Sequence, residues 1–269
     1  MPELPEVETT LRGIDPYMRG QRIERVIIRQ PRLRWPISEQ VAQIGGRRII
    51  DLSRRAKYLL MQLDQGHLIW HLGMSGSMKI QPVGSRVELH EHVELQMDSG
   101  QALKFRDPRR FGALLYCEQS PLQHRLLQQL GPEPLGEDFD AAYLHRCCRG
   151  RSAAIKTVIM NSHVVVGVGN IYASEALFLA GIRPGRAARS ISRPKMARLV
   201  ESIRHILSEA ISQGGSTLRD FTQADGNPGY FVQSLMVYGN RGDCKHCGKG
   251  IKKIVQGQRS SYYCPDCQS

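Results

Sequence analysis

Residues 244–267 read Cys244-Lys-His-Cys247-GKGIKKIVQGQRSSYY-Cys264-Pro-Asp-Cys267, which is two Cys-x2-Cys pairs separated by 16 residues. The spacing is typical of a four-cysteine zinc site, because each pair forms a tight turn that directs two thiolates toward one metal. The 16 intervening residues match the length of a β-hairpin. Two disulfide bonds are the alternative, and a reducing cytoplasm disfavours them. We predict one structural Zn2+ bound by Cys244, Cys247, Cys264 and Cys267, and no organic cofactor.

The composition is that of a folded and strongly basic protein. The 269 residues include 37 Lys and Arg against 25 Asp and Glu, which gives a net charge of +12. Such a charge favours a polyanionic partner, with nucleic acid first. No apolar run approaches the roughly 20 residues of a membrane span, and the acidic start Met1-Pro-Glu-Leu-Pro-Glu6 lacks a signal-peptide pattern. We therefore expect a cytoplasmic protein that does not contact membranes.

The first 130 residues predict mostly β structure after one short helix. Val7, Leu11 and Ile14 recur at helical spacing behind Pro5, and Gly13 and Pro16 are expected to end that helix. Short apolar stretches separated by Gly, Ser, Asp or Pro then favour a β-sandwich or barrel. The expected strands are Val26–Ile28, Ile49–Leu52, Tyr58–Leu63, Leu68–Leu72, Val93–Met97, Ala102–Phe105 and Ala113–Cys117.

Beyond the Pro/Gly/acidic stretch that starts at Gly131, the apolar spacing becomes helical. Ser192 and Pro194 mark the start of the longest helix, and Gly214-Gly215 follow its end. We predict three domains: a β-sandwich over residues 1–130, a helical domain over 131–230 that ends in a polar loop at 216–230, and a zinc module over 231–269. The other expected helices contain Phe139/Tyr143/Cys147, Ile155/Ile159 and Ile171 to Leu179.

Gly167 and Gly169 lie between two helical patterns, and Asn170 opens the second. Backbone N–H groups at such a turn can bind a phosphate with help from the helix dipole. A plain helix–helix turn explains the same residues.

Six blocks occur in one order along the chain. They are Met1-Pro-Glu-Leu-Pro-Glu-Val-Glu8, Arg54-Arg-Ala-Lys57, His71-Leu-Gly-Met-Ser-Gly76, Asp107-Pro-Arg-Arg-Phe-Gly112, Gly167-Val-Gly-Asn-Ile-Tyr-Ala-Ser-Glu175 and the four-cysteine tail. Together they resemble the bacterial formamidopyrimidine-DNA glycosylase family, whose members remove 8-oxoguanine, from residue 2 to the last cysteine.

The resemblance implies an α+β fold: an N-terminal β-sandwich with flanking helices, a helical helix–two-turn–helix domain and a C-terminal four-cysteine zinc-finger β-hairpin. It also implies a bacterial enzyme of base-excision repair that acts on damaged double-stranded DNA as a monomer without an obligate protein partner. The loop at 216–230 would then be the lesion-recognition loop.

The resemblance further assigns the chemistry. Removal of Met1 exposes Pro2, whose secondary amine attacks C1′ of the sugar, expels the base and forms a Schiff base that leads to β,δ-elimination. Glu3 supplies the acid–base function. Lys57 and Arg259 grip the phosphates that flank the lesion and are assigned as proton donors. The supporting carboxylates are Glu6 and Glu175.

The family pattern also assigns DNA contacts. Met74, Arg109 and Phe111 match the residues that fill the space left by an extruded base. The further predicted DNA-binding residues are His71, His90, Arg151, Lys156, Asn170 and Tyr238. This chain departs from the pattern at Asn161, where relatives carry Asp.

Two other functions remain as alternatives. Endonuclease VIII-like glycosylases prefer oxidised pyrimidines, but they begin Pro-Glu-Gly-Pro-Glu, and Leu4 and Phe111 argue against that group. A zinc-ribbon protein that binds DNA without chemistry fits the charge and the cysteines equally well, although it has no need of a free amine at Pro2. By composition alone, Met74 and Phe111 are core residues.

Overall fold

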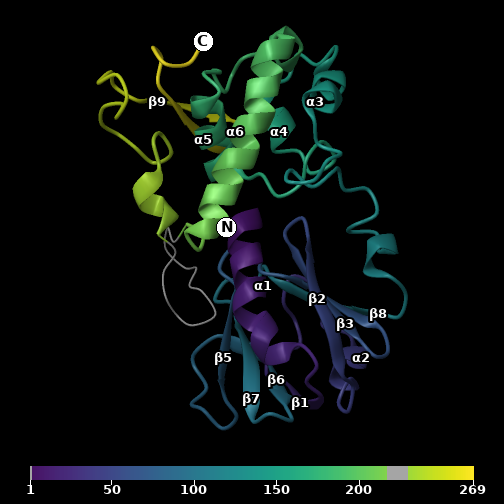
Figure 1. The fold of residues 1–269 in the computed structure, drawn as a ribbon. Helices are drawn as coiled ribbons and strands as arrows, with labels where there is room; N and C mark the ends of the chain where they lie inside the picture. The colour runs from purple at the N-terminus through teal and green to yellow at the C-terminus, as the bar shows by residue number, and fades with distance from the viewer. Residues whose placement is uncertain (1, 217–229) are drawn as a thin grey trace. The chain divides into compact units, whose positions relative to one another are not determined.

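The computed structural model describes residues 2–216 and 230–269. The predicted lesion-recognition loop therefore lies almost wholly outside the described residues, as does Met1. The chain divides into two compact units, which are described separately: the first contains residues 1–128 and 213–232, and the second contains residues 129–212 and 233–269 (Figure 1). Within the described ranges, no helix is both long enough and apolar enough to cross a membrane.

The first unit contains two four-stranded antiparallel sheets, which confirms the β-sandwich prediction. One sheet has the order β1-β6-β7-β5 and the other β2-β3-β4-β8. The strands are β1 Ile23–Ile28, β2 Ile49–Arg55, β3 Tyr58–Leu63, β4 His67–His71, β5 Ser77–Pro82, β6 Glu91–Met97, β7 Gln101–Arg106 and β8 Ala113–Cys117. Trp70 of β4 meets Phe105 of β7 edge to face, with ring centroids 5.3 Å apart, so the two sheets share one apolar core.

Helix α1 (Leu4–Met18) precedes the sheets and is longer than predicted, because neither Gly13 nor Pro16 ends it. Proline inside a helix removes one hydrogen bond, and an interior glycine costs about 1 kcal/mol relative to alanine. Ile14 and Met18 are 1% and 0% exposed in the core, and their burial offsets both penalties. The short helices α2 (Glu39–Ala42) and η1 (Pro121–Gln123) complete this part of the chain.

The second unit is helical, as the sequence predicts. Helix α3 packs on α6, α6 packs on α5, and α5 packs on strand β10. The elements are α3 Ala141–Cys148, α4 Ile155–Ile159, α5 Asn170–Leu179, η2 Ala188–Ser190 and α6 Arg193–Ser212, and the short helix η3 Phe231–Ser234 spans the passage from the first unit to the second.

The cysteine pairs flank a hairpin of β9 (Lys252–Gln256) and β10 (Arg259–Tyr263), which confirms the hairpin prediction. Its two-residue turn has positive φ at both Gly257 (52°) and Gln258 (62°). Positive φ at both central positions is the mark of a type I′ turn, whose twist matches that of the strands. Arg259 is therefore the first residue after a tight and well-defined turn.

Candidate functional site

The N-terminus of α1 holds the predicted nucleophile and its carboxylates. Pro2 directly precedes Glu3, the N-cap residue of the helix, and Glu3 and Glu6 form a capping box. In it, the Glu3 backbone N–H donates to Glu6 Oε2 at 2.7 Å. Glu3 and Glu6 are only 3% and 2% exposed. The peptide next to Pro2 is therefore fixed by a buried carboxylate, as a reacting group requires.

The Glu6 carboxylate also binds Ser216, the last described residue before the part of the predicted lesion-recognition loop that lies outside the described residues. Glu6 Oε1 accepts hydrogen bonds from the backbone N–H of Ser216 at 2.8 Å and from its hydroxyl at 2.9 Å. Gly215 allows this approach, since its φ is +80° and an added Cβ would lie 3.1 Å from Glu6 Oε1. Glu6 thus joins the start of α1 to the base of the predicted lesion-recognition loop. Sequence reasoning missed Ser216, because no local signal reports a partner 210 residues away.

Lys57 and His71 lie at the same end of the sheet β2-β3-β4-β8. Lys57 follows the left-handed Ala56 (φ 55°) in the turn between β2 and β3, and His71 pairs with Tyr58 in the next ladder. Burial, and then the charges of Lys57 and Arg34, lower the pKa of His71 to about 4. The neutral ring accepts the Gly73 N–H at Nδ1, 3.0 Å away. His71 therefore acts here as an uncharged acceptor at neutral pH.

Met74 and Phe111 lie on two loops that pack directly against each other. At Gly73 (φ +67°), an added Cβ would lie 2.4 Å from backbone atoms of both Phe111 and Gly112. The two apolar side chains are nevertheless exposed, Met74 by 37% and Phe111 by 46%. The guanidinium of Arg109 stacks over the Phe111 ring at 5.1 Å. The core-packing interpretation of Met74 and Phe111 is therefore wrong.

One buried carboxylate ties these two loops together. Asp107 is 0% exposed, and it accepts the Ser75 hydroxyl at 2.6 Å and the Gly112 N–H at 2.7 Å. The Arg109 N–H in turn donates to Ser75 Oγ at 3.1 Å. These bonds hold the three predicted void-filling side chains on one rigid support. The motif containing Asp107 was visible in the sequence, but its contact with Ser75 was not.

In the second unit, three of the predicted residues meet beside the zinc hairpin. Lys156 Nζ donates to Asn170 Oδ1 at 2.7 Å, to Ser261 Oγ at 2.8 Å and to the Ser260 carbonyl at 3.3 Å. Asn170 Nδ2 also donates to the Ser260 carbonyl at 3.1 Å and to the Tyr238 hydroxyl at 3.4 Å. Lys156 is only 1% exposed, so a phosphate would reach its ammonium only by displacing one of these partners. The geometry favours a lysine that positions Asn170 and β10.

Glu175 is a structural carboxylate of the same unit. It is 2% exposed and accepts the backbone N–H groups of Met236 (2.8 Å), Val237 (3.0 Å) and Tyr238 (2.7 Å). Burial raises its pKa, and the three hydrogen bonds oppose that shift. Glu175 therefore fixes the backbone that carries Tyr238.

The four predicted cysteines form a compact ligand cluster, with all four sulfurs within 4.8 Å of one another. The Sγ atoms of Cys244 and Cys267 are 3.9 Å apart, and those of Cys247 and Cys264 are 3.4 Å apart. A disulfide needs about 2.05 Å, so the disulfide alternative fails. Zn–S bonds of about 2.3 Å place tetrahedral sulfurs about 3.8 Å apart. The donor set thus fits one structural Zn2+.

The remaining predicted residues lie on the surface or in turns. Arg259 and Arg151 are exposed, and His90 has a positive φ of 72° while its carbonyl accepts the Asp107 N–H. At the one departure from the family pattern, Asn161 Oδ1 accepts the His163 N–H at 3.0 Å. An amide oxygen serves as well as a carboxylate oxygen in that turn.

Comparison with known sequences now decides the family. Three models match in chain order: the formamidopyrimidine-DNA glycosylase N-terminal domain over residues 1–114, its H2TH domain over 130–222 and a zinc finger found in FPG and IleRS over 244–269. The chain belongs to the formamidopyrimidine-DNA glycosylase family. A relative of that name from Thioalkalivibrio sulfidiphilus is 58% identical, and one from Pasteurella multocida is 51% identical; both alignments cover 100% of this chain and at least 99% of the relative.

Solved structures of formamidopyrimidine-DNA glycosylases have the same fold. The MutM (Fpg) protein from Thermus thermophilus is 38% identical, with a TM-score of 0.89 over 99% of this chain and 98% of that one. A mutant Lactococcus lactis Fpg in complex with DNA that contains Fapy-dG is 33% identical, with a TM-score of 0.92 over 99% of both chains. The family relation therefore rests on sequence and fold together.

Proposed function

We propose that this chain is a bifunctional DNA glycosylase and AP lyase of base-excision repair that removes oxidised purines, 8-oxoguanine opposite C and formamidopyrimidines. The observation that carries the proposal is a buried set of hydrogen bonds: Glu6 binds the backbone of Glu3, the residue next to Pro2, and also binds Ser216. Family membership supports it, since the relatives are named formamidopyrimidine-DNA glycosylase and solved Lactococcus lactis relatives contain Fapy-dG or abasic-site DNA.

Pro2 acts as the nucleophile once Met1 has been removed. A terminal amine has an ordinary pKa of about 7.7–8.0, and the positive end of the α1 dipole disfavours its protonated form. The nitrogen bonds to C1′ as the bond from C1′ to the base breaks, and loss of the ring oxygen from C1′ leaves an iminium. That iminium withdraws electrons, so the 3′ and then the 5′ phosphate leave by elimination. Glu3, next to the amine, exchanges the protons of ring opening.

The exposed loop pair accounts for access to the base. A base inside a duplex must leave the stack before it can react, at a cost of a few kcal/mol. Met74 and Phe111 fill the vacated space, and Arg109 donates hydrogen bonds to the estranged cytosine, which gives a preference for lesions opposite C. The Asp107 and Ser75 contacts keep these side chains at the surface without a duplex present.

Phosphate contacts come from both units. In the first unit the proposed contacts are Lys57, His71 and His90. In the second unit they are Asn170, Tyr238, Arg151 and Arg259, and Lys156 positions Asn170. Four sulfur ligands leave no open coordination position for water, so the Zn2+ holds the hairpin that carries Arg259. We further propose a monomer that needs no protein partner.

Borohydride reduction tests the proposal. Protein shown by intact mass to lack Met1 is mixed with an 8-oxoguanine:C duplex and reduced, and the adduct is mapped. A covalent adduct at Pro2 is expected, whereas Pro2→Gly protein should give none. Efficient trapping only on thymine-glycol duplexes would favour the oxidised-pyrimidine group, and tight binding without any adduct would favour a non-enzymatic DNA-binding protein.

A further inference from the structure

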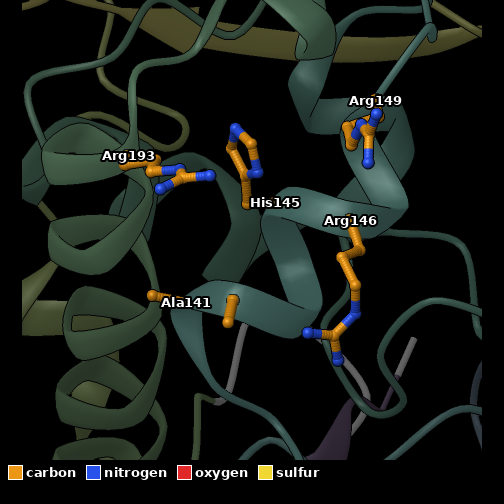
Figure 2. Close-up of a pocket in the computed structure, with 6 residues that line it drawn as sticks. Ala141, His145, Arg146, Arg149 and Arg193 are labelled. Carbon is orange, nitrogen blue, oxygen red and sulfur yellow. The ribbon is translucent and has the colours of Figure 1, made fainter.

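A hollow on the second unit is lined by basic side chains from two helices. Its volume is about 660 Å³, within the range of ligand pockets, which runs from about 300 to 1,000 Å³. Figure 2 shows Arg193 of α6 extending toward His145 of α3. The lining residues are Ala141, Ala142, His145, Arg146, Arg149 and Arg193.

The sequence of α3 explains why this face is basic. Ala141 and His145 are spaced four apart and share one side of α3, Arg146 follows His145, and Arg149 is the C-cap residue of the helix. Leu144 and Cys148 are instead buried, at 0% and 1% exposure. The two alanines of the first turn leave room where longer side chains would close the hollow.

Within the described residues, no Asp or Glu oxygen lies within the salt-bridge distance of 4.0 Å from these basic groups. None of the side chains of His145, Arg146, Arg149 and Arg193 makes a hydrogen bond or ion pair there. Asp140, the acidic residue next to this face, accepts the Tyr143 N–H at 2.6 Å as the cap of α3. Three arginines therefore line one hollow without a carboxylate in salt-bridge range, and a bound anion would offset part of their positive charge.

Arg193 makes the arrangement harder to explain by helix stability alone. Basic residues in the last turn of α3 suit the negative end of its dipole. Arg193 opens α6, where the dipole is positive, and the first turn of α6 contains no acidic residue. A cation at this position destabilises α6. An anion in the hollow would be stabilised both by the Arg193 charge and by the positive end of the α6 dipole.

We propose that this hollow is a second phosphate-binding site, separate from the positions proposed to hold the lesion duplex. The hollow is lined by α3 and the start of α6, whereas Arg259 lies on β10, which packs on α5; Arg151, which follows Arg149 by two residues, is not among the lining residues. Planar guanidiniums bind phosphate oxygens in pairs. The ligand carries phosphate, either as the backbone of a second DNA segment or as a free phosphorylated compound.

Calorimetry tests the site in the full-length zinc-loaded protein. The protein is first saturated with an undamaged duplex, which fills the positions proposed for DNA, and is then titrated with inorganic pyrophosphate. The variant Arg146→Gln/Arg149→Gln/Arg193→Gln should bind pyrophosphate about tenfold more weakly or worse. A control that removes three guanidiniums outside the hollow, Arg25→Gln/Arg48→Gln/Arg198→Gln, should bind like the unchanged protein. Thermal unfolding confirms that both variants are folded.

A second labelled duplex identifies the phosphate source. Binding of that duplex to the saturated protein, competed by pyrophosphate and lost in the hollow variant, would identify the DNA backbone. Pyrophosphate binding without the second duplex would identify a free phosphorylated compound. Absence of pyrophosphate binding, or equal affinity in the two triple variants, would overturn the proposal.

Discussion

Substitution of Glu6 by glutamine should uncouple the nucleophile from the loop base. Among the described residues, the carboxylate accepts hydrogen bonds from the Glu3 N–H at 2.7 Å, the Ser216 N–H at 2.8 Å and the Ser216 hydroxyl at 2.9 Å. An amide has one acceptor oxygen, so its NH2 group must face either the Glu3 N–H or the Ser216 N–H. A buried donor left without an acceptor, together with loss of the charge on the other bonds, costs about 3 kcal/mol.

The matched control is Ser216→Ala, which removes the hydroxyl bond to Glu6 and keeps the backbone one, and it should cost about 1 kcal/mol. Denaturant unfolding measures both values. Because Glu6 and Ser216 share a bond, the double variant should be less destabilised than the sum of the two single variants. Borohydride trapping should slow by about tenfold or more in Glu6→Gln, since the residue beside Pro2 loses its anchor. A Glu6→Gln protein as stable as Ser216→Ala that traps at the unchanged rate would refute this reasoning.

Three further outcomes are expected. Met74→Ala and Phe111→Ala should leave the unfolding free energy nearly unchanged, since both side chains are exposed. Both variants should excise the base from duplexes more slowly. A large loss of stability would show instead that the two side chains pack in the core. Acidification from pH 6.5 toward 4 should destabilise the protein, because unfolded His71 binds a proton that the folded ring, with a pKa of about 4, does not. At pH 5 the loss relative to pH 8 is about 2 kcal/mol, and the pH dependence of His71→Asn, which keeps an acceptor for Gly73, should lack it. Removal of zinc by a chelator should weaken DNA binding about as much as Arg259→Gln does in the zinc-loaded protein. If chelation weakened the binding of Arg259→Gln by the same further factor, the metal would have a role separate from Arg259.

Elements with a strong local signal could be predicted from the sequence. Most strands of the β-sandwich, the long α6 and the zinc hairpin follow from spacing and turn residues alone. Strand β5 was missed, because Ser77–Pro82 directly follows a Gly/Ser-rich motif and ends at a proline. Helix α2 has four residues, which is too short to show any period. Pro16 indicated a helix end that does not occur, because burial of Met18, a property of the folded core, keeps α1 intact.

The candidate site divides in the same way. Motifs indicated Pro2, Lys57 and Arg259, because their order along the chain matches a family. Contacts between distant segments had no signal: Asp107 reaches Ser75 across 32 residues, and Lys156 reaches Ser261 across 105. Lys156 is an example: its place in the family pattern indicates a phosphate contact, whereas its hydrogen bonds to Asn170, Ser260 and Ser261 are visible only in the structure.

Under the function proposed above, the packing of the Gly73 loop against Gly112 would set how quickly undamaged DNA can be inspected. Ordering a free loop costs about 1–2 kcal/mol per residue, and a flexible wedge would meet that cost at every base pair it tested. Here the backbone beneath Met74 and Phe111 is already fixed by glycines that admit no side chain and by one buried carboxylate. Each trial insertion then has only the stacking of the DNA to overcome. A protein that must reject a great many normal base pairs for each lesion gains time at every one of them.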